Sequence, residues 1–456
     1  MSFFIRKDAP KRQRQANQKD GKRKQTDRPL RKKNEEISSE SEDDDEEPKA
    51  NGHHGDDNLE LDDNEAMESA LEKRYRLAKE YLKQVEEEEK EKADFQTVDH
   101  DAIAHRLKED ALEQVGRLQR KIADTCQPSD PSSFQVLRGH RLAPTCLRVS
   151  HDGKKLVSGS KDGSIIKWDL ETGKRLHVIK SVAQDKNGKG HHGDVLALAL
   201  STDDKYLCSG GTDTSIKTWD FRSMEFVKTF TGHRGAVSGL AFRRNHNQLF
   251  SCSHDRSLKI WNLDEMGYVD TMYGHQDAIL DIDSLTRERA ITCGGRDRTI
   301  RIWKVAEESQ LVFHAQSGCG TIECLRLIND DHFVSGADDG SLAVWSALKK
   351  KPVCVVHKAH QEWVASLATQ PYTDLVASGS WDGQVKLWRC AEDYRALTLL
   401  HSLAVDGFVN AMAFTPESTA LICAVGQEHR SGRWWRKTNA KNSIVVCPLG
   451  KVQNGI

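Results

Sequence analysis

The chain has 456 residues, enough to bury a sizeable core, and it carries 67 Lys and Arg against 69 Asp and Glu. This near balance hides two opposed blocks: residues 1–33 hold 13 basic and 3 acidic residues, whereas residues 34–65 hold 1 basic and 15 acidic residues. Neither block has the apolar content to form a core. No apolar run has membrane-spanning length and the basic first ten residues lack an apolar centre, so we expect neither a membrane protein nor a secretion signal.

The eleven cysteines include no Cys-x-x-Cys pair, and most lie in apolar runs such as Thr145-Cys146-Leu147. This pattern favours buried free thiols in a reducing compartment over disulfides or a zinc site. The sequence therefore predicts no metal and no cofactor.

Residues 1–64 are predicted to be a disordered tail, basic and then acidic. Its basic clusters are typical of a nuclear or nucleolar import signal, although such clusters also bind nucleic acid directly. They are Lys11-Arg12-x-Arg14, Lys22-Arg23-Lys24 and Arg31-Lys32-Lys33. Ser39 and Ser41 each have an acid three residues later, which predicts phosphorylation by an acid-directed kinase.

Residues 65–133 are predicted to form helical segments, because apolar residues recur at helical spacing over 65–85 and again over 101–123. These residues are Leu71, Leu77, Tyr81 and Val85 in the first segment, and Ile103, Leu107, Val115, Leu118 and Ile122 in the second. Such helices either dock on the following domain or a partner, or form only transiently within a tail.

A repeat of about 40 residues runs from residue 139 to the C-terminus, and most units open near a His and end on a Trp 27 or 28 residues later. The pairs are His140 and Trp168, His192 and Trp219, His233 and Trp261, His275 and Trp303, and His360 and Trp388. A further unit ends at Trp345 and has a longer lead from His314. A period of this length indicates stacked or circular repeats.

Two polar positions accompany each Trp. Six residues before it stands an Asp: Asp162, Asp213, Asp255, Asp297, Asp339 and Asp382. Ten residues before it stands Ser158, Ser209, Ser251, Cys293, Ser335 or Ser378. On these residues the chain resembles the WD-repeat family, in which one His, Ser or Thr, Asp and Trp per blade form a buried hydrogen-bonded relay.

The resemblance implies an all-β fold, a seven-bladed β-propeller over residues 134–456, carried on the disordered and helical N-terminal extension. It assigns His140, Ser158, Asp162 and Trp168 to the relay of the first blade, and His233, Ser251, Asp255 and Trp261 to that of the third. Since a thiol is a weak donor, Cys293 predicts an incomplete relay in the fourth blade.

Alternating apolar residues predict short strands bounded by turns, four to a blade. The irregular seventh unit has candidate strands at 408–414, 420–425 and 442–448. We expect its fourth strand to come from 134–137, so that the two ends of the repeat region pair in one blade and close the ring.

The sequence contains no Gly-Lys-Ser/Thr phosphate loop, no Gly-x-Ser-x-Gly elbow and no His-Glu-x-x-His metal helix, and it predicts a protein that is not an enzyme. Contacts to other molecules are expected from residues that the repeat does not need. The first candidate is the insertion that contains Arg430, Arg433, Trp434, Arg436, Lys437 and Lys441. Cationic groups neutralise phosphates and indoles stack on unpaired bases, so this composition favours RNA.

Two further candidates are Arg296 with Arg298, and Arg243 with Arg244. The alternative for these pairs is an ordinary solvated turn. For the insertion, the alternative is that one Trp packs into the blade and the charges face water.

A narrower resemblance concerns 34–39, 232–244, 336–341 and 426–435, which are similar to the WD-repeat proteins specific to the U3 small nucleolar ribonucleoprotein. It implies binding to the box B/C region of U3 small nucleolar RNA, beside the box C/D core proteins. It also implies a nuclear and nucleolar role with other proteins of the small-subunit processome, in pre-rRNA processing and 18S rRNA maturation. The alternative is a protein-only adaptor, such as a ubiquitin-ligase substrate receptor or a chromatin scaffold.

Overall fold

The computed structural model describes residues 75–76, 78–79, 81–83, 104, 106–108, 111–112, 119–182, 189–315 and 320–451. The chain divides into two units, 1–78 and 79–456. The predicted tail, its import signal, Ser39 and Ser41 lie outside the described residues. The described residues between 75 and 112 are helical, and none of the described helices is long and apolar enough to cross a membrane.

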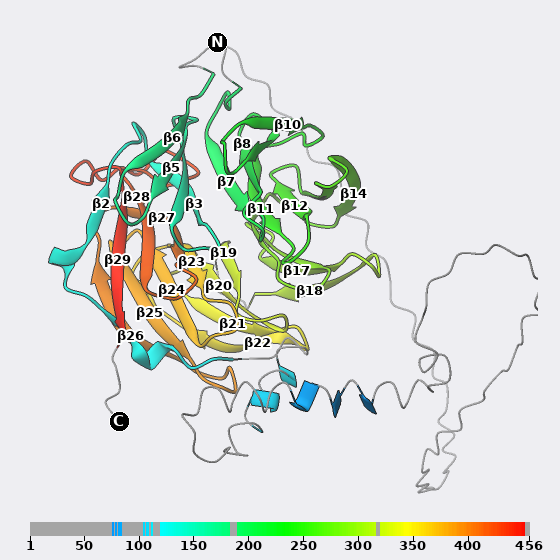
Figure 1. Ribbon diagram of the computed structural model, residues 1–456. Helices are drawn as coiled ribbons and strands as arrows, with labels where there is room; N and C mark the ends of the chain where they lie inside the picture. Colours follow the sequence, from blue (N-terminus) through cyan, green and yellow to red (C-terminus); the bar gives the residue numbers. More distant parts are fainter. Residues whose placement is uncertain are drawn as a thin grey trace, which may run out of the picture. The chain divides into compact units, whose positions relative to one another are not determined.

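Seven small antiparallel sheets form a β-propeller in the described part of the second unit, which confirms the predicted fold (Figure 1). Each of the first six blades is a four-stranded meander. The first blade has β3 (Pro144–Val149), β4 (Lys155–Ser160), β5 (Ile165–Asp169) and β6 (Arg175–Ile179). The second has β7 (Val195–Leu200), β8 (Tyr206–Gly211), β9 (Ile216–Asp220) and β10 (Phe226–Phe230), and the third β11 (Val237–Phe242), β12 (Gln248–Ser253), β13 (Ser257–Asn262) and β14 (Gly267–Tyr273).

The next three blades have the same order. The fourth has β15 (Ile279–Asp283), β16 (Arg289–Gly294), β17 (Thr299–Lys304) and β18 (Ser309–His314). The fifth has β19 (Ile322–Leu327), β20 (His332–Ala337), β21 (Leu342–Ser346) and β22 (Lys349–Val356), and the sixth β23 (Val364–Thr369), β24 (Leu375–Ser380), β25 (Gln384–Cys390) and β26 (Leu397–Ala404). The first strand of each blade lines the central channel.

The seventh blade closes the ring as predicted. Its inner strands are β27 (Phe408–Phe414), β28 (Ala420–Gly426) and β29 (Ser443–Lys451), and its outer edge comes from the other end of the repeat region. Strand β2 (Gln135–Leu137) pairs with β29, with Leu137 opposite Ile444, and Figure 1 shows cyan β2 alongside red β29. A second short strand, β1 (Cys126–Pro128), also pairs with β29, which the sequence analysis did not predict.

The apolar core lies between the blades. Seven clusters of buried side chains each join two successive blades, and one of them joins the seventh blade to the first through Leu137, Trp168 and Ile422. Blade Trp residues such as Trp168 and Trp303 are almost completely buried in these clusters. Each blade therefore depends on its neighbours for the burial of its apolar faces.

The predicted relay is present in the first and third blades. In the third, His233 Nδ1 lies 2.9 Å from Asp255, His233 Nε2 lies 2.8 Å from Ser251 Oγ, and the Trp261 indole N–H donates to the same hydroxyl. In the first, His140 and Trp168 both bond to Ser158, but His140 reaches Asp162 through Ser164. Each buried polar group thus has a partner within its blade.

Two relay predictions were wrong. In the second blade the relay histidine is His191, which bonds to Asp213 and Ser209, whereas His192 contributes only its backbone N–H to Asp213. The relay of the fourth blade is complete, because the Thr292 hydroxyl bonds to both His275 and Trp303. The turn between the second and third strands of this blade is one residue longer than in the other blades that carry a relay Trp. The position ten residues before the Trp is therefore Cys293, whose side chain lies on the opposite face of the strand from Thr292.

The fifth blade has only part of the relay. Trp345 donates to Ser335, while His314 is an exposed residue at the end of β18 and does not enter the relay. In the sixth blade His360 joins Asp382 and Ser378, as in the third.

The predicted second helix does not continue to residue 123. Gln119 to Ile122 lie outside any helix, and the backbone N–H groups of Ile122 and Ala123 both donate to the Asp374 carboxylate of the sixth blade. Two single 3₁₀ turns, η1 (Ala123–Thr125) and η2 (Pro131–Ser133), then carry the chain to β1 and β2. The Asp374 carboxylate accepts two N–H groups that have no helical partner, and it thereby holds this part of the chain against the sixth blade.

Every described cysteine is a free thiol, and all except Cys354 are buried. The prediction of buried free thiols is confirmed for these residues. Burial raises the pKa of thiols such as Cys208 to about 12, which keeps them protonated and unreactive.

Candidate nucleic-acid interface

Residues 427–442 join β28 to β29 and cover one end of the central channel. This segment lies on the face that carries the Asp turns of the relay, here called the relay face. Lys161, beside Asp162, donates to Gly432 O at 2.8 Å, and Lys437 donates to Trp381 O, beside Asp382, at 2.6 Å. The insertion is thereby anchored to the turns of the first and sixth blades.

An aromatic cluster holds the middle of the insertion. The Trp435 ring is stacked on Trp381 with centroids 5.3 Å apart, and it meets Trp363 edge-on at 4.6 Å. Trp381 is in turn stacked on Phe408 of β27. Offset and edge-on aromatic contacts of this kind stabilise a loop beyond the area that they bury. One of the two adjacent indoles is therefore structural.

The other indole is free. Trp434 is 85% exposed, the highest value among the large hydrophobic residues of the described chain. An exposed indole of this size has no role in the fold that would explain it, and its face is available for stacking.

Three cations surround a single acid at the base of the insertion. The Glu428 carboxylate lies 3.7 Å from Lys161 Nζ, 3.5 Å from Arg433 Nε and 3.9 Å from Arg436 Nε. The side chains of Arg433 and Arg436 are still 66% and 57% exposed. Asp194 is a second acid that interacts with Lys161 and Arg433, so three positive charges face two negative ones, and Lys441 adds an exposed ammonium group nearby in the chain.

Arg430 and Lys437, both predicted to contact RNA, point inward instead. Arg430 donates to Glu323 O across the channel at 2.8 Å, and Lys437 bonds to Trp381 as described above. Glu323 lies in a β-bulge of β19, between Ile322 and Cys324, where it has no paired residue in β20. Its carbonyl oxygen is therefore available to Arg430. These two cations position the insertion, so the solvent-facing set is Arg433, Trp434, Arg436 and Lys441.

His429 is buried beneath the insertion. Burial, and then the charges of Arg430 and Lys161, lower the pKa of His429 to about 3, which keeps the imidazole neutral near pH 7. Its ring contacts Trp363 and Phe408, and its Nδ1 accepts the Ser431 backbone N–H at 3.3 Å. It is a packing residue of the cluster.

The structure brings Arg296 to the same surface. A groove of about 490 Å³ on the relay face is lined by Arg296 and Gly295 of the fourth blade and by Trp434, Trp435 and Ser431 of the insertion. Arg298 lies in the same exposed turn as Arg296, with a left-handed backbone at φ 51°. Arg296, but not Arg298, therefore shares a groove with the insertion, and the acids Asp277, Glu323 and Asp338 line the same groove.

Arg243 and Arg244 lie at the other end of the channel. They follow β11, which starts at the relay face and ends at the other face of the propeller, here called the opposite face. Six residues of β-strand span about 20 Å. Arg243 bonds to Thr286 O and pairs with Glu288, so it belongs to a turn between the third and fourth blades. This pair does not share a surface with the insertion.

Sequence reasoning missed Trp363, Trp381 and Lys161. Trp381 stands directly before a relay Asp, where the other blades have polar residues, as at Lys161 and Arg296. Trp363 stands three residues after a relay His, where the other blades with a relay His have Ala or Asp. A Trp that breaks the polar or small pattern of a repeat is a signal that could have been used.

The arrangement is suited to binding rather than to covalent chemistry. It offers an exposed stacking plane, guanidinium groups beside it and a groove that continues to a neighbouring blade. Among the described residues, no three His, Cys, Asp or Glu side chains are placed to hold a metal ion.

Comparison with known proteins identifies the repeat. The family model for the WD domain, G-beta repeat, matches six segments: 131–169, 183–220, 224–262, 267–304, 308–346 and 350–389. The seventh blade lies outside these matches except for β2, and its inner strands lack the Asp and Trp of the repeat.

The chain is 49% identical over 433 residues to U3 small nucleolar RNA-interacting protein 2 of Mus musculus, covering 92% of this chain and 89% of that protein. The protein of the same name from Homo sapiens is 50% identical, covering 84% and 83%. Ribosomal RNA-processing protein 9 of Saccharomyces cerevisiae is 27% identical, covering 85% and 91%. A solved structure described as the RRP9 WD40 repeats is 48% identical with a TM-score of 0.69, covering 71% of this chain and 99% of that one.

Proposed function

Since the chain belongs to the WD-repeat family, and within it to the family of the U3 small nucleolar RNA-interacting proteins, we propose that it is a non-catalytic RNA-binding component of the U3 small nucleolar ribonucleoprotein. The propeller is its scaffold. The surface formed by Arg433, Trp434, Arg436 and Lys441 with Arg296 is its RNA contact.

The exposed indole of Trp434 beside two exposed guanidinium groups is the observation that carries this proposal. Stacking on an aromatic side chain is worth about 1–3 kcal/mol per unpaired base, and every base has a face to stack. Guanidinium groups next to the stacked base neutralise the flanking phosphates. The surface therefore fits an unpaired RNA segment better than a duplex.

The finer part of the proposal follows from the family. The RNA segment is the box B/C region of U3 small nucleolar RNA, and the neighbours are the box C/D core proteins and other proteins of the small-subunit processome. The site of action is the nucleolus, in pre-rRNA processing and 18S rRNA maturation. The relatives support this through their names, which refer to U3 small nucleolar RNA and to ribosomal RNA processing.

The charge contribution is tested by replacing Arg433, Arg436 and Lys441 together with Ala in the full chain. Binding to a U3 RNA fragment is measured from 50 to 300 mM salt. Each lost phosphate contact lowers the slope of log K against log salt by about 0.7 on single strands, so we expect a loss of about 2. The matched control replaces Lys349, Lys350 and Lys351, three exposed lysines of β22 on the outer edge of the fifth blade.

The stacking contribution is tested separately with Trp434→Ala, which should cost about 1–3 kcal/mol of binding free energy with an unchanged salt slope. Trp435→Ala is not an equivalent control, because that ring packs on Trp381 and Trp363. If the triple variant and the lysine control lose the same slope, the insertion is not the contact surface.

Crosslinking in cells then tests the RNA partner. Enrichment of U3 small nucleolar RNA over other small RNAs is the expected result. A broad background without enrichment would instead favour a protein-only adaptor that works through peptides on the propeller faces.

A further inference from the structure

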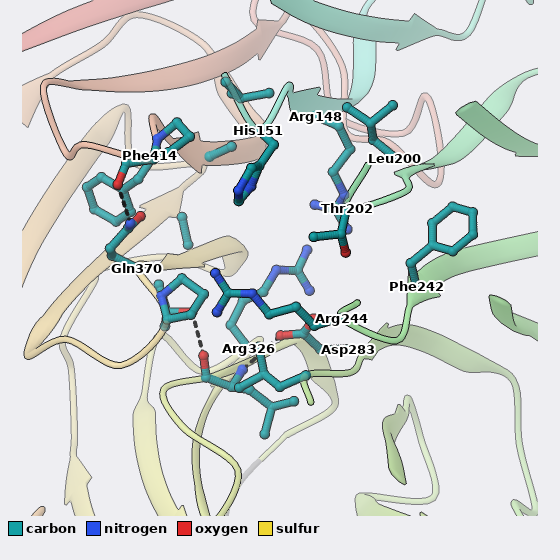
Figure 2. A pocket seen from close by; sticks show the side chains of 18 of the residues that line it. Arg148, His151, Leu200, Thr202, Phe242, Arg244, Asp283, Arg326, Gln370 and Phe414 are labelled. Carbon is teal, nitrogen blue, oxygen red and sulfur yellow. Dashed lines mark hydrogen bonds between the residues drawn. The ribbon is translucent and has the colours of Figure 1, made fainter. Parts of the chain in front are cut away.

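The central channel opens on the opposite face into a cavity of about 530 Å³. Its walls come from all seven blades, at the ends of the inner strands (Figure 2). The side chains of Arg148, Arg244 and Arg326, from the first, third and fifth blades, reach into this cavity. Three guanidinium groups thus share one cavity, at the other end of the channel from the insertion.

Two of these three groups have no polar partner in the described chain. The Arg148 guanidinium makes no hydrogen bond or ion pair with any described residue, although it lies deep in the channel. The Arg244 guanidinium has only an aromatic contact, 5.7 Å above the Tyr372 ring on the far side of the channel mouth. Burial, and then the charge of Arg326, lower the pKa of Arg148, although the carboxylates of Asp283 and Asp281 attract its charge without accepting a hydrogen bond from it.

The acids nearby are already engaged. Asp281 pairs with Arg326, with Nη1 and Oδ2 2.6 Å apart. Asp283 accepts the Leu327 backbone N–H at 2.9 Å, and both oxygens of Asp204 face the His151 backbone N–H at 3.0 and 3.1 Å. Because the local carboxylates are used in this way, the donors of Arg148 and Arg244 remain open to an anion from outside.

We propose that this cavity binds a small ligand that carries phosphate groups. Guanidinium groups donate in a fork that matches phosphate oxygens, and two forks from different blades fit a ligand with more than one negative charge. A single carboxylate would satisfy only one of them. The volume lies within the range of small-molecule sites, about 300–1,000 Å³, and the cavity is open to solvent at the channel mouth, so a small ligand can enter it.

The proposal is tested by titrating the full chain with inorganic pyrophosphate and with inositol hexakisphosphate in a calorimeter. Both probes should bind with one site per chain. Arg148→Ala and Arg244→Ala should each weaken binding about 10-fold or more, the usual effect of losing a charge-assisted hydrogen bond. Arg243→Ala removes the same charge one residue away, from a side chain that pairs with Glu288, and should leave affinity unchanged.

The thermal midpoint of each variant shows whether the substitution has disturbed folding. Arg148→Ala should keep or raise the thermal midpoint, because the native charge is unpaired, and Arg148→Lys should recover part of the affinity by restoring the charge. Affinity for U3 RNA should be unchanged in Arg148→Ala, since the insertion lies at the other end of the channel.

Four results would overturn the proposal: no heat of binding with either probe, an equal loss in Arg243→Ala, displacement of the probe by U3 RNA, or tighter binding of a glutamate-rich peptide than of pyrophosphate. The last two would assign the cavity to RNA or to an acidic protein segment.

Discussion

A single residue decides whether the fourth blade has a complete relay. Ser251 and Thr292 occupy equivalent places, each paired with the residue two before its Trp, at Lys259 and Arg301. The turn that follows Thr292 is one residue longer, so Thr292 lies 11 residues before its Trp and Ser251 lies 10 before its own. Because side chains alternate along a strand, Cys293 faces the fifth blade and takes no part in the relay.

Thr292→Val should therefore destabilise the protein by about 1–3 kcal/mol, because it keeps the shape and removes the hydroxyl that bonds to His275 and Trp303. Chemical unfolding of the variant and the parent measures the difference. Adding Cys293→Ser to this variant should restore nothing. Rescue by the second change would mean that position 293 can supply the hydroxyl.

Trp434 and Trp435 are adjacent in the chain but have different roles. Trp435 is held between Trp363 and Trp381, whereas Trp434 projects into solvent. Composition alone cannot separate them, because both are large and amphipathic. The partners of Trp435 are in the sixth blade, far away in the chain.

At the scale of elements, the seventh blade is the one that the chain assembles from both ends of the repeat region. Its outer edge is divided into β1 and β2, which together pair with β29 at Cys126 to Pro128 and Gln135 to Leu137. Without them, β29 would be an exposed edge with unpaired N–H and C=O groups. Closure of the ring therefore depends on a segment that precedes the first repeat.

A chain that begins at residue 139 should have a lower thermal midpoint than one that begins at 119, and it should self-associate through the open edge of β29. The shorter chain also loses the buried side chains of Ala123, Cys126 and Leu137. Thermal unfolding and size-exclusion chromatography report the two effects. A chain that begins at 131 keeps β2 but not β1, and its thermal midpoint should lie between those of the other two chains. Equal midpoints for all three chains would show that β29 needs no outer partner.

At the scale of the whole molecule, five relay aspartates from five blades act in parallel. Burial alone would raise their pKa values, but hydrogen bonds from His and other donors outweigh it and lower the net pKa of each. For Asp297 the pKa falls to about 2. A carboxyl group with a folded pKa below its unfolded value adds stability above the unfolded pKa, and this stability is lost as the pH falls through the folded pKa.

The thermal midpoint should accordingly fall steeply between about pH 4 and pH 2. Asp297→Asn should reduce that fall by less than about one fifth, because the pKa of Asp297 is lowered less than those of the relay aspartates of the first three blades, while lowering the midpoint at pH 7. Circular dichroism melts at half-unit pH steps would show this. An unchanged acid dependence in the variant would mean that the relay aspartates do not control acid stability.

The molecule also separates its two candidate sites by the length of its channel. The insertion and Arg296 share the relay face, while Arg148 and Arg244 line the cavity on the opposite face. Neighbouring inner strands contact each other around the ring, so both ends of the channel are built on one rigid scaffold.

The propeller, its ring closure and the relays of the first, third and sixth blades could be predicted from the amino-acid sequence alone. The repeated spacing of His, Asp and Trp is a local property that can be read directly in the sequence. The strand at 135–137 follows from the need to cover the open edge of the seventh blade. The relay histidine of the second blade was also within reach, because His191 lies 28 residues before Trp219, like its counterparts.

The side chains of the insertion that face solvent could be identified only from the folded chain. Arg430 turns inward to a carbonyl of the fifth blade and Lys437 to one of the sixth, whereas Arg433 and Arg436 remain exposed. It also joined Arg296 to the insertion and placed Arg148 and Arg244 around one cavity. Each of these facts depends on which blades become neighbours around a closed ring, and contacts between residues far apart in the chain, such as Lys437 with Trp381 at 56 positions and Arg430 with Glu323 at 107, leave no local pattern in the sequence.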